Sequence, residues 1–416
     1  MINVEEGVGG MFVESKDSIK VVMIFVDAFS SRYVNEKYCP FLFKILQSNG
    51  EYKLIEPLFA FEGIGTTIFT GTWPESHGVW TSFIRVDRPR YQISNLILSI
   101  STKLSEIIPN DRLAWDLRYL TYKLLGKPVP IPHLIPSNLL KYFQHIPWYF
   151  FTQKNKILTL FDVVKKHERT IANLNVSSIL GDKMVVERTI KYFRSKKIAD
   201  LTYLKLSKLD LIGHKYGPKS NQIKSCVKIL DSVLQKIIKG ISDISNVIFL
   251  VFSDHGMVPV RNWINIAQLL DRTSLKTGRD FLFFLDSTMV RFWFSKEKAR
   301  NIIESMLSNI KCGRFISRSE LKKLRLPTND YYGELIFVLD EHNVIHPDFF
   351  HRHEPVKGMH GYYKSSYDNP ILIIYPPDNF RISTNKYLRF VDIAPTVLDL
   401  LEIPHHQCEG KSIIRG

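Results

Sequence analysis

Short apolar runs alternate with segments of helical periodicity along most of this 416-residue chain. The runs are rich in Val, Ile, Leu and Phe, which is typical of strands buried on both faces of a sheet. They lie at 19–29, 199–210, 245–256 and 369–377. Residues 221–241 have apolar side chains at the spacing of an amphipathic helix, and residues 39–50 predict a helix that stops at Gly50. This alternation predicts an α/β fold: a doubly wound, mainly parallel sheet with helices on both faces.

Two regions interrupt the alternation. Residues 81–154 contain prolines and aromatic residues with an excess of basic side chains. We expect a helical cap insertion there that closes over an anionic substrate; a helical decoration packed on the core is the alternative. Residues 276–353 predict a small α+β subdomain whose first strand covers 281–295. The core α/β domain then has three parts, at 19–80, 155–275 and 354–416.

The chain is basic, with 56 Lys and Arg against 41 Asp and Glu and a formal net charge of +15. This excess favours acidic partners such as phosphorylated substrates, nucleic acid or anionic lipid. No zinc-finger or RNA-binding motif accompanies it, so we expect no specific nucleic-acid binding. Arg85, Arg88 and Arg90 in the cap are candidates for holding an outer phosphate, and a solvated charged face is the alternative for them.

The four cysteines are scattered along the chain, and no two of them have metal-binding or redox spacing. This pattern favours a reducing compartment. The first ten residues lack the basic and apolar regions of a signal peptide, and no apolar run approaches the roughly 18 residues of a membrane span. We therefore expect a soluble cytoplasmic protein. Peripheral contact with a membrane and the oligomeric state stay open.

Six carboxylate and imidazole side chains stand out because each follows a predicted buried strand or lies in a glycine-containing loop. They are Asp27, Asp210, His214, Asp254, His255 and His360. The carboxyl ends of parallel strands meet at one edge of a sheet, where α/β proteins collect their chemistry. Taken singly, each residue has an ordinary alternative as a helix cap, a turn residue or a solvated histidine. Taken together, they form a ligand set that suits zinc or a similar first-row ion.

The adjacent pair Asp254 and His255 favours two ions rather than one, because consecutive side chains on an extended segment point apart. Two divalent ions about 4 Å apart clamp the attacking and leaving oxygens of an in-line displacement at phosphorus. Five other histidines lack a comparable context, and we expect them to be ordinary, mostly solvated residues. They are His77, His351, His353, His405 and His406.

At these motifs the chain resembles the alkaline phosphatase superfamily, and within it the nucleotide pyrophosphatase/phosphodiesterase branch. The motifs are "VVMIFVDAFSSRYV", "FTGTWPESHG", "LDLIGHKYGP", "VFSDHGM", "GMHGYY" and "VDIAPTVLDLLEIPHHQCEGKSI". They run from near residue 20 to residue 412 and cover the core but not the insertions. The resemblance implies two divalent metals, usually zinc with manganese as the alternative, on an alkaline phosphatase-like sheet. It assigns one metal to Asp210, His214 and His360, and the other to Asp27, Asp254 and His255.

The chain departs from the family at the nucleophile. The family has Thr or Ser about nine residues before the Thr-Gly pair that stands here at 70–71, and counting back reaches Phe61. Either Glu62 ligates a metal or acts as a base for direct attack, or a shift of register brings Thr66 to the site, or the covalent step and even catalysis have been lost. The structural alternatives are that Glu62 is an acidic residue in the first turn of a helix and that Thr66 is part of a buried helical face. Ser82 matches the family's phosphoryl-binding Asn.

These features predict a metal-dependent phosphohydrolase or phosphodiesterase that cleaves a phosphate ester or diester. The expected substrate is a phosphorylated small molecule or a lipid-linked or glycan-linked phosphate. A phosphotransferase with a glycan or lipid acceptor is the first alternative. A metal-binding member of the fold without catalysis is the second, because Phe61 offers no nucleophilic atom.

Overall fold

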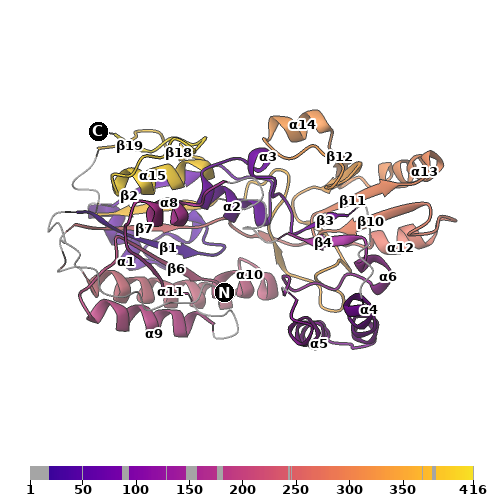
Figure 1. Ribbon diagram of the computed structural model, residues 1–416, viewed down its shortest axis with the longest axis horizontal. Helices are drawn as coiled ribbons and strands as arrows, with labels where there is room; N and C mark the ends of the chain where they lie inside the picture. The colour runs from indigo at the N-terminus through magenta and orange to yellow at the C-terminus, as the bar shows by residue number, and fades with distance from the viewer. Residues whose placement is uncertain are drawn as a thin grey trace.

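A seven-stranded sheet forms the centre of one lobe of the molecule (Figure 1). The computed structural model describes residues 18–48, 50–86, 93–127, 129–146, 157–175, 181–241, 244, 246–367, 369–376 and 381–415. The strand order is β18 (Tyr387–Leu388), β2 (Glu51–Ile55), β16 (Ile371–Tyr375), β7 (Val247–Phe252), β1 (Lys20–Val26), β6 (Leu201–Leu206) and β5 (Ile171–Asn173). Of these strands, β16 alone runs antiparallel to its neighbours.

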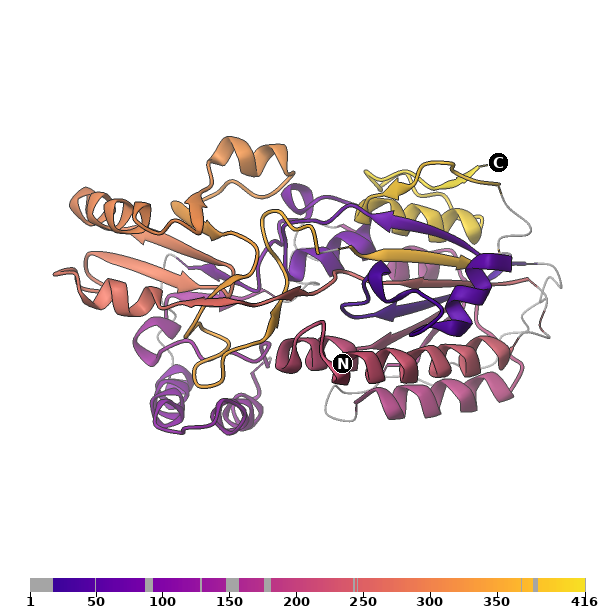
Figure 2. The same cartoon turned by 180° about the vertical axis from the view of Figure 1, so that it is seen from behind.

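Both faces of this sheet are covered by helices, as Figures 1 and 2 show from opposite sides. Alternate residues of β1 enter two different cores, because successive side chains of a strand point to opposite faces. Val21 and Met23 pack with one set of helices: α2 (Glu62–Thr70), α8 (Leu160–Lys166) and α15 (Ile393–Leu400). Val22 and Ile24 pack with the other: α1 (Pro40–Ser48), α9 (Gly181–Arg194) and α11 (Asn221–Lys239). The expected doubly wound, mainly parallel α/β fold is confirmed.

The second lobe is built on a four-stranded antiparallel sheet. Its order is β10 (Phe281–Leu285), β11 (Met289–Phe294), β13 (Leu335–Leu339) and β12 (Gly313–Phe315). The helices of this part of the chain are α12 (Ile266–Asp271), α13 (Glu297–Ser308) and α14 (Arg318–Lys323). The antiparallel pair of β3 (Phe83–Arg85) and β4 (Phe143–His145) contributes Phe83 and Phe143 to the same apolar core as Phe284. The two regions that interrupt the core sequence therefore share one hydrophobic core.

Three helices of the first inserted region flank this lobe: α4 (Ile93–Glu106), α5 (Asp111–Leu124) and α6 (Ser137–Leu140). Short strand pairs lie between and around the lobes. They are β8 (Val258–Pro259) with β15 (Gly358–Met359), β9 (Asn262–Ile264) with β14 (Asn343–Ile345), and β17 (Arg381–Ile382) with β19 (Ile414–Arg415). The remaining short helices are α3 (Pro74–His77), α10 (Lys208–Tyr216), and two 3-10 turns at Ser31–Tyr33 and Phe390–Asp392. Arg88 and Arg90 lie outside the described residues.

Two predicted strands have different limits in the structure. The run 281–295 is a hairpin rather than one strand, because the polar residues 286–288 form its turn. Asp286 there is buried against Arg291, with its Oδ2 2.7 Å from the arginine Nε. The run 199–210 ends as a strand at Leu206, and Asp210 belongs to helix α10. Asp182 accepts hydrogen bonds from the backbone at the start of this helix, a long-range cap that the local pattern does not reveal.

Candidate metal centre

The ends of two neighbouring parallel strands place the first group of candidate ligands. Asp27 follows β1 directly, and Asp254 and His255 lie just beyond β7, its hydrogen-bonded neighbour. The Nε2 atom of His255 is 3.4 Å from Asp27 Oδ1 and 3.4 Å from Asp254 Oδ2. The parallel register thus converts a distance of more than 200 residues along the chain into direct contact.

Helix α10 places the second group. Asp210 and His214 are four residues apart on one helix face, and Asp210 Oδ1 lies 3.2 Å from His214 Nε2. The prediction that these residues sit at a strand end or in a loop is therefore wrong, while their convergence holds. His360 follows strand β15 directly. This strand lies close to α10 because both segments have glycine at the point of contact. A Cβ atom on Gly358 would come within 2.4 Å of the Gly213 carbonyl oxygen.

The two groups meet through stacked histidine rings. The rings of His255 and His360 are 3.5 Å apart and nearly parallel, and those of His214 and His360 are 5.2 Å apart. One ligand atom from each of Asp210, His214 and His360 lies within 4.8 Å of the others. The same limit holds for Asp27, Asp210 and His255. All six residues selected from the sequence thus converge on one small volume.

The polar atoms of the centre are arranged as metal ligands are. His214 Nδ1 lies 2.9 Å from the Gly358 carbonyl oxygen, and His255 Nδ1 lies 2.8 Å from that of Gly256. A carbonyl oxygen only accepts hydrogen bonds, so each Nδ1 carries hydrogen and the Nε2 atom of each ring faces the carboxylates. His360 Nδ1 is buried and has no hydrogen-bond partner among the described residues. This donor set fits a pair of divalent cations.

Electrostatics point the same way. Burial and the neighbouring Asp27 carboxylate raise the pKa of Asp254 to about 7. Carboxylates packed this closely repel each other, and a divalent cation between them removes the repulsion. The centre therefore gains from binding positive charge.

Lys205 supplies one positive charge and was missed in the sequence. Its Nζ lies 2.7 Å from Asp27 Oδ2, the oxygen that does not face His255. Burial opposes the charge on this amine, but Asp27 and Asp254 outweigh it and raise the pKa of Lys205 above its ordinary value. A single lysine within the apolar strand β6 was the available signal. The ion pair holds Asp27 with its other oxygen directed at the ligand group.

Helix α2 begins beside the centre with Phe61 and Glu62. The Phe61 ring lies 6.2 Å from the His360 ring and packs on Gly361, where a Cβ atom would approach a ring carbon to 2.5 Å. Glu62, the first residue of the helix, is attracted by Lys205 and repelled by Asp27, and its burial raises its pKa above the ordinary value. Its carboxylate therefore feels the same charges as the metal ligands do.

The other two candidates for the reaction lie differently. Thr66 is fully buried, and its hydroxyl donates to the Glu62 carbonyl oxygen at 3.4 Å within the helix. Ser82 is also buried, and its carbonyl oxygen accepts a hydrogen bond from the backbone of Ile146. The Ser82 contact involves its backbone only, so the proposed phosphoryl-binding role of its hydroxyl stays a prediction, as does the role of Thr66.

Two of the remaining histidines differ from the solvated residues that were expected. His77 is fully buried: the Val79 amide donates to its Nδ1, and its Nε2 contacts the Thr67 hydroxyl at 2.9 Å. Burial lowers the pKa of His77 to about 3. The ring of His351 lies 6.1 Å from that of His214, which places it beside the centre. The prediction of a solvated His77 is wrong because α2 covers this residue. The local sequence around His351 did not indicate that its ring lies near His214.

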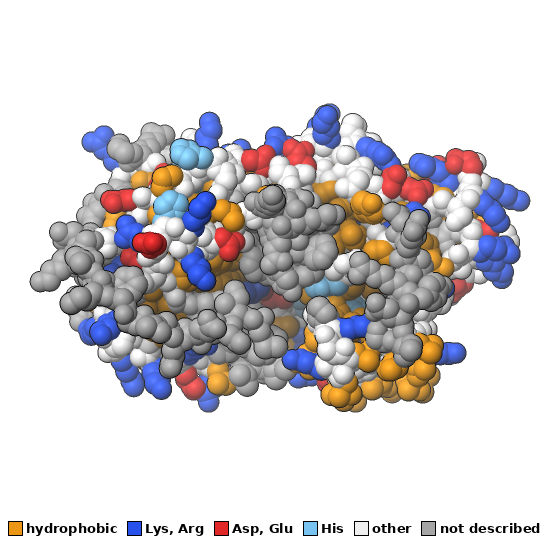
Figure 3. Space-filling view, viewed as in Figure 1, with side chains coloured by type: hydrophobic (Ala, Val, Ile, Leu, Met, Phe, Trp, Pro, Cys, Tyr) orange, Lys and Arg blue, Asp and Glu red, His pale blue; other side chains and the backbone are white. Residues whose placement is uncertain are grey.

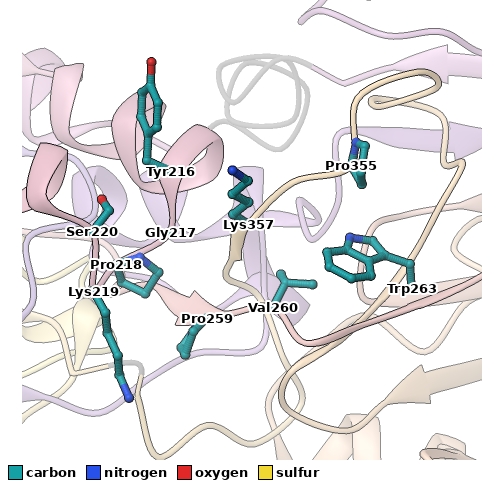
Figure 4. Close-up of a pocket in the computed structure, with 10 residues that line it drawn as sticks. All are labelled: Tyr216, Gly217, Pro218, Lys219, Ser220, Pro259, Val260, Trp263, Pro355 and Lys357. Atoms are coloured by element: carbon teal, nitrogen blue, oxygen red, sulfur yellow. The ribbon is translucent and has the colours of Figure 1, made fainter.

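A groove of about 440 Å³ lies at the end of α10 (Figure 4). None of the six candidate ligands lines it, but the backbone amide of its Lys357 donates to the His214 carbonyl oxygen at 2.8 Å. Tyr216 and Trp263 line it with the lysines Lys219 and Lys357. Its walls continue the segments that carry the ligands, since Lys357 lies next to Gly358 and the stretch 217–220 follows α10 directly. The groove thus combines aromatic and positively charged side chains near the candidate metal ligands.

A doubly wound sheet with these carboxylates and imidazoles at its carboxyl edge defines the class: the alkaline phosphatase superfamily. The family model for type I phosphodiesterase / nucleotide pyrophosphatase matches residues 21–386. The chain belongs to that family, whose members are hydrolases, and the resemblance drawn from the motifs is confirmed.

Individual relatives from this class of enzyme have low sequence identity to this chain. Venom phosphodiesterase 2 of Crotalus adamanteus is 26% identical over 203 residues, which are 46% of this chain and 20% of the venom protein. An uncharacterised pyrophosphatase/phosphodiesterase of Schizosaccharomyces pombe is 24% identical over 271 residues, 61% of this chain and 48% of the yeast protein. The matched part is thus a fifth to a half of these relatives' lengths.

Solved structures share the fold. Human ectonucleotide pyrophosphatase/phosphodiesterase 5 superposes with a TM-score of 0.65 at 15% identity, covering 95% of this chain and all of the human chain. The murine protein, as the inactive T72A variant in complex with AMP, gives a TM-score of 0.64 at 16% identity over 96% of this chain and all of the murine chain. The fold therefore extends over nearly the whole chain.

Proposed function

We propose that this chain is a metal-dependent phosphodiesterase that cleaves a phosphodiester or pyrophosphate bond. The observation that supports it most is the convergence of two ligand groups, one from strand ends and one from α10 and β15, with histidine Nε2 atoms facing carboxylate oxygens at 3.2–3.4 Å. Three carboxylates gathered around imidazole nitrogens favour the binding of cations.

The proposed cofactors are two divalent ions, zinc first and manganese second, because nitrogen and oxygen donors of this kind suit both. Asp210, His214 and His360 would hold one ion, and Asp27, Asp254 and His255 the other. When bound, such ions neutralise phosphoryl oxygens and lower the pKa of water. Lys205 keeps Asp27 oriented from the outside of the ligand group.

Glu62 is the proposed general base. Phe61, at the position where the family has its hydroxyl nucleophile, has no atom that can attack phosphorus or ligate a cation. The Glu62 carboxylate is the next side chain on the helix, and its electrostatic neighbours are Lys205 and Asp27. In this proposal a water molecule attacks phosphorus, Glu62 takes its proton, and no phosphorylated protein forms.

The proposed substrate is a nucleotide-like phosphodiester or pyrophosphate. Lys219 and Lys357 would contact its outer phosphate, and the Tyr216 and Trp263 rings would contact an aromatic group. Lipid-linked and glycan-linked phosphates are the alternatives, and the substrate assay decides between them. We also propose a cytoplasmic location, which the four free thiols support.

The test is hydrolysis of bis-p-nitrophenyl phosphate and p-nitrophenyl phosphate by chelator-treated protein with Zn²⁺ or Mn²⁺ added back. Release of nitrophenol from the diester that depends on metal supports the proposal. Metal binding without release points to a phosphotransferase or to a protein without catalysis. Adding glycerol or a sugar as acceptor then separates these two, because only a transferase produces the phosphorylated acceptor.

A further inference from the structure

The helices α4 and α5 carry an unusual concentration of exposed apolar side chains. Among the described residues, fifteen large apolar side chains are strongly exposed, and eight of them lie on or directly after these two helices. They are Leu96, Ile97, Ile100, Leu104, Ile107, Leu113, Leu120 and Leu124, with exposed fractions from 46% to 79%. Figure 3 shows apolar side chains gathered over this part of the second lobe, with Lys and Arg side chains around them. We call these eight residues the α4–α5 apolar face.

Apart from Leu98, the buried described residues of α4 are polar, the reverse of an ordinary surface helix. Ser101, Thr102 and Ser105 point inward and are buried, and each of their hydroxyls is hydrogen-bonded. The Ser101 hydroxyl lies 2.6 Å from that of Thr121 on α5. The helix therefore keeps its hydrogen-bonding residues inside and leaves most of its Leu and Ile outside.

Helix α5 buries polar Arg118 and Thr121 beside Ala114 and Tyr122. Its fully buried Arg118 donates from Nε to the Ser105 hydroxyl at 2.7 Å and from NH1 to the Ile135 carbonyl oxygen at 2.9 Å. Leu113 and Leu124, eleven residues apart on the outer face, are 59% and 78% exposed. Polar contacts hold the pair together, so the apolar face contributes little to folding and is available to another partner.

The pair of helices α4 and α5 is also hydrogen-bonded to another part of the protein. Arg352 donates from NH1 to the Glu106 carbonyl oxygen at 2.9 Å, and its backbone amide donates to Asp111 Oδ2 at 2.8 Å. Arg352 follows His351, whose ring lies beside His214 of the candidate metal centre. The apolar face is thus presented on a support that connects to the centre.

We propose that the α4–α5 apolar face docks on the surface of an anionic lipid bilayer. Three exposed basic residues, Lys103, Arg112 and Lys123, lie on the same two helices, and the chain as a whole carries a charge of +15. Leu and Ile bordered by basic residues match an interfacial helix that inserts its apolar face about 5–10 Å into the headgroup boundary. A protein partner is less favoured, because protein interfaces are depleted in Lys and rely on aromatic and Arg anchors.

The inferred contact lies on the membrane and does not cross it. Among the described residues, no helix has both the length and the hydropathy for a transmembrane span. This inference is independent of the proposed reaction, since it uses no residue of the metal centre. It assigns the inserted region a role in bringing the protein to a lipid surface.

The test is sedimentation of the full chain with vesicles of phosphatidylcholine alone or with phosphatidylglycerol added. Wild type is expected to bind the anionic vesicles. The double variant Ile107→Ser, Leu124→Ser removes the two most exposed apolar side chains and should bind at least about tenfold more weakly. The double variant Lys103→Glu, Lys123→Glu should lose about tenfold on anionic vesicles and little on neutral ones.

The matched control is Met184→Ser with Ile229→Ser, two exposed apolar residues on helices of the other lobe, which should bind as wild type does. Circular dichroism and sedimentation velocity confirm that each variant is folded. The inference is overturned if wild type binds neither kind of vesicle or if the control weakens binding as much as the α4–α5 variants. It is also overturned if the apolar face instead joins two copies, seen as a dimer that Ile107→Ser, Leu124→Ser dissociates.

Discussion

Helices α10 and α2 both direct their first turn at the same centre, and they differ in what they bring to it. Asp210 and His214 of α10 face each other at 3.2 Å, the arrangement that the family motif implies. At the start of α2, the position of the family's hydroxyl nucleophile holds Phe61, whose ring packs on Gly361. One helix carries the ligand pair that the motif implies, while the other carries an apolar ring followed by a carboxylate where the motif count places the family's attacking group.

This difference separates two tasks that the family usually combines. Ligand binding depends on a fixed set of atoms, so the loss of one ligand removes the ion that it holds. Attack on phosphorus needs only a deprotonated oxygen in place, which water and a base also provide. We therefore expect substitutions on α10 to abolish the reaction, substitutions at the start of α2 to slow it, and substitutions deeper in α2 to leave it nearly unchanged.

The largest effect is expected for His214→Ala. Loss of this ligand should lower the rate of diester hydrolysis by roughly a thousandfold or more, because the site depends on the bound cation for charge stabilisation. Metal content measured by mass spectrometry should fall by about half. The control is His405→Ala, whose Nε2 lies 2.8 Å from Asp399 and outside the centre. A His214→Ala protein with wild-type metal content would contradict the ligand assignment.

Glu62→Gln should have the next largest effect, about a hundredfold on kcat, which is typical for loss of a general base. A base must be deprotonated to act, and burial raises the pKa of Glu62. The wild-type rate should therefore fall as pH decreases, starting above the range of an ordinary glutamate, and the variant should lack this acid limb. Glu56→Gln, an exposed acid nearby in sequence, is the control. An unchanged pH profile would exclude Glu62 as the base.

Lys205→Met should have a smaller effect, about tenfold in metal affinity, because the ion pair to Asp27 supports a ligand without being one. Competition with a chromophoric chelator measures this affinity directly. Lys205→Arg keeps the charge and should recover most of the lost affinity. If the Lys205→Met variant binds the metals as tightly as wild type does, the ion pair does not position Asp27.

Thr66→Val is expected to change kcat by less than about twofold, because the Thr66 hydroxyl donates to a backbone carbonyl within α2. The substitution preserves shape and removes only the oxygen. A loss comparable with that of Glu62→Gln would instead identify Thr66 as the attacking group. Intact-mass analysis of protein quenched during turnover would then find a phosphorylated species.

The sequence was sufficient for the core fold and for the six ligand candidates. Asp27 and the pair Asp254–His255 follow strands whose apolar character is unmistakable, and parallel strands bring their ends together. Asp210 lies with the other candidates but was placed on the wrong element, because the cap on α10 comes from Asp182, far back in the chain. The convergence of the candidate ligands could be predicted from the sequence. The helix that carries Asp210 could not, because its start depends on the distant contact with Asp182.

Other features were beyond local patterns. Lys205 interrupts an apolar strand by one residue, and only the register of β1 with β6 places its amine against Asp27. His77 looked like a loop histidine until α2 covered it. Helical periodicity marks two faces of α4, but it does not say which one is buried, and the structure buries the one with Ser101, Thr102 and Ser105. Each case depends on packing between segments far apart in sequence.

The most direct test of the central claim is an anomalous difference map from zinc-soaked crystals at the zinc absorption edge. Two peaks about 4 Å apart are predicted, one within reach of Asp210, His214 and His360, and the other within reach of Asp27, Asp254 and His255. A single peak, or peaks away from these side chains, would contradict a two-metal centre and with it the proposed phosphodiesterase chemistry.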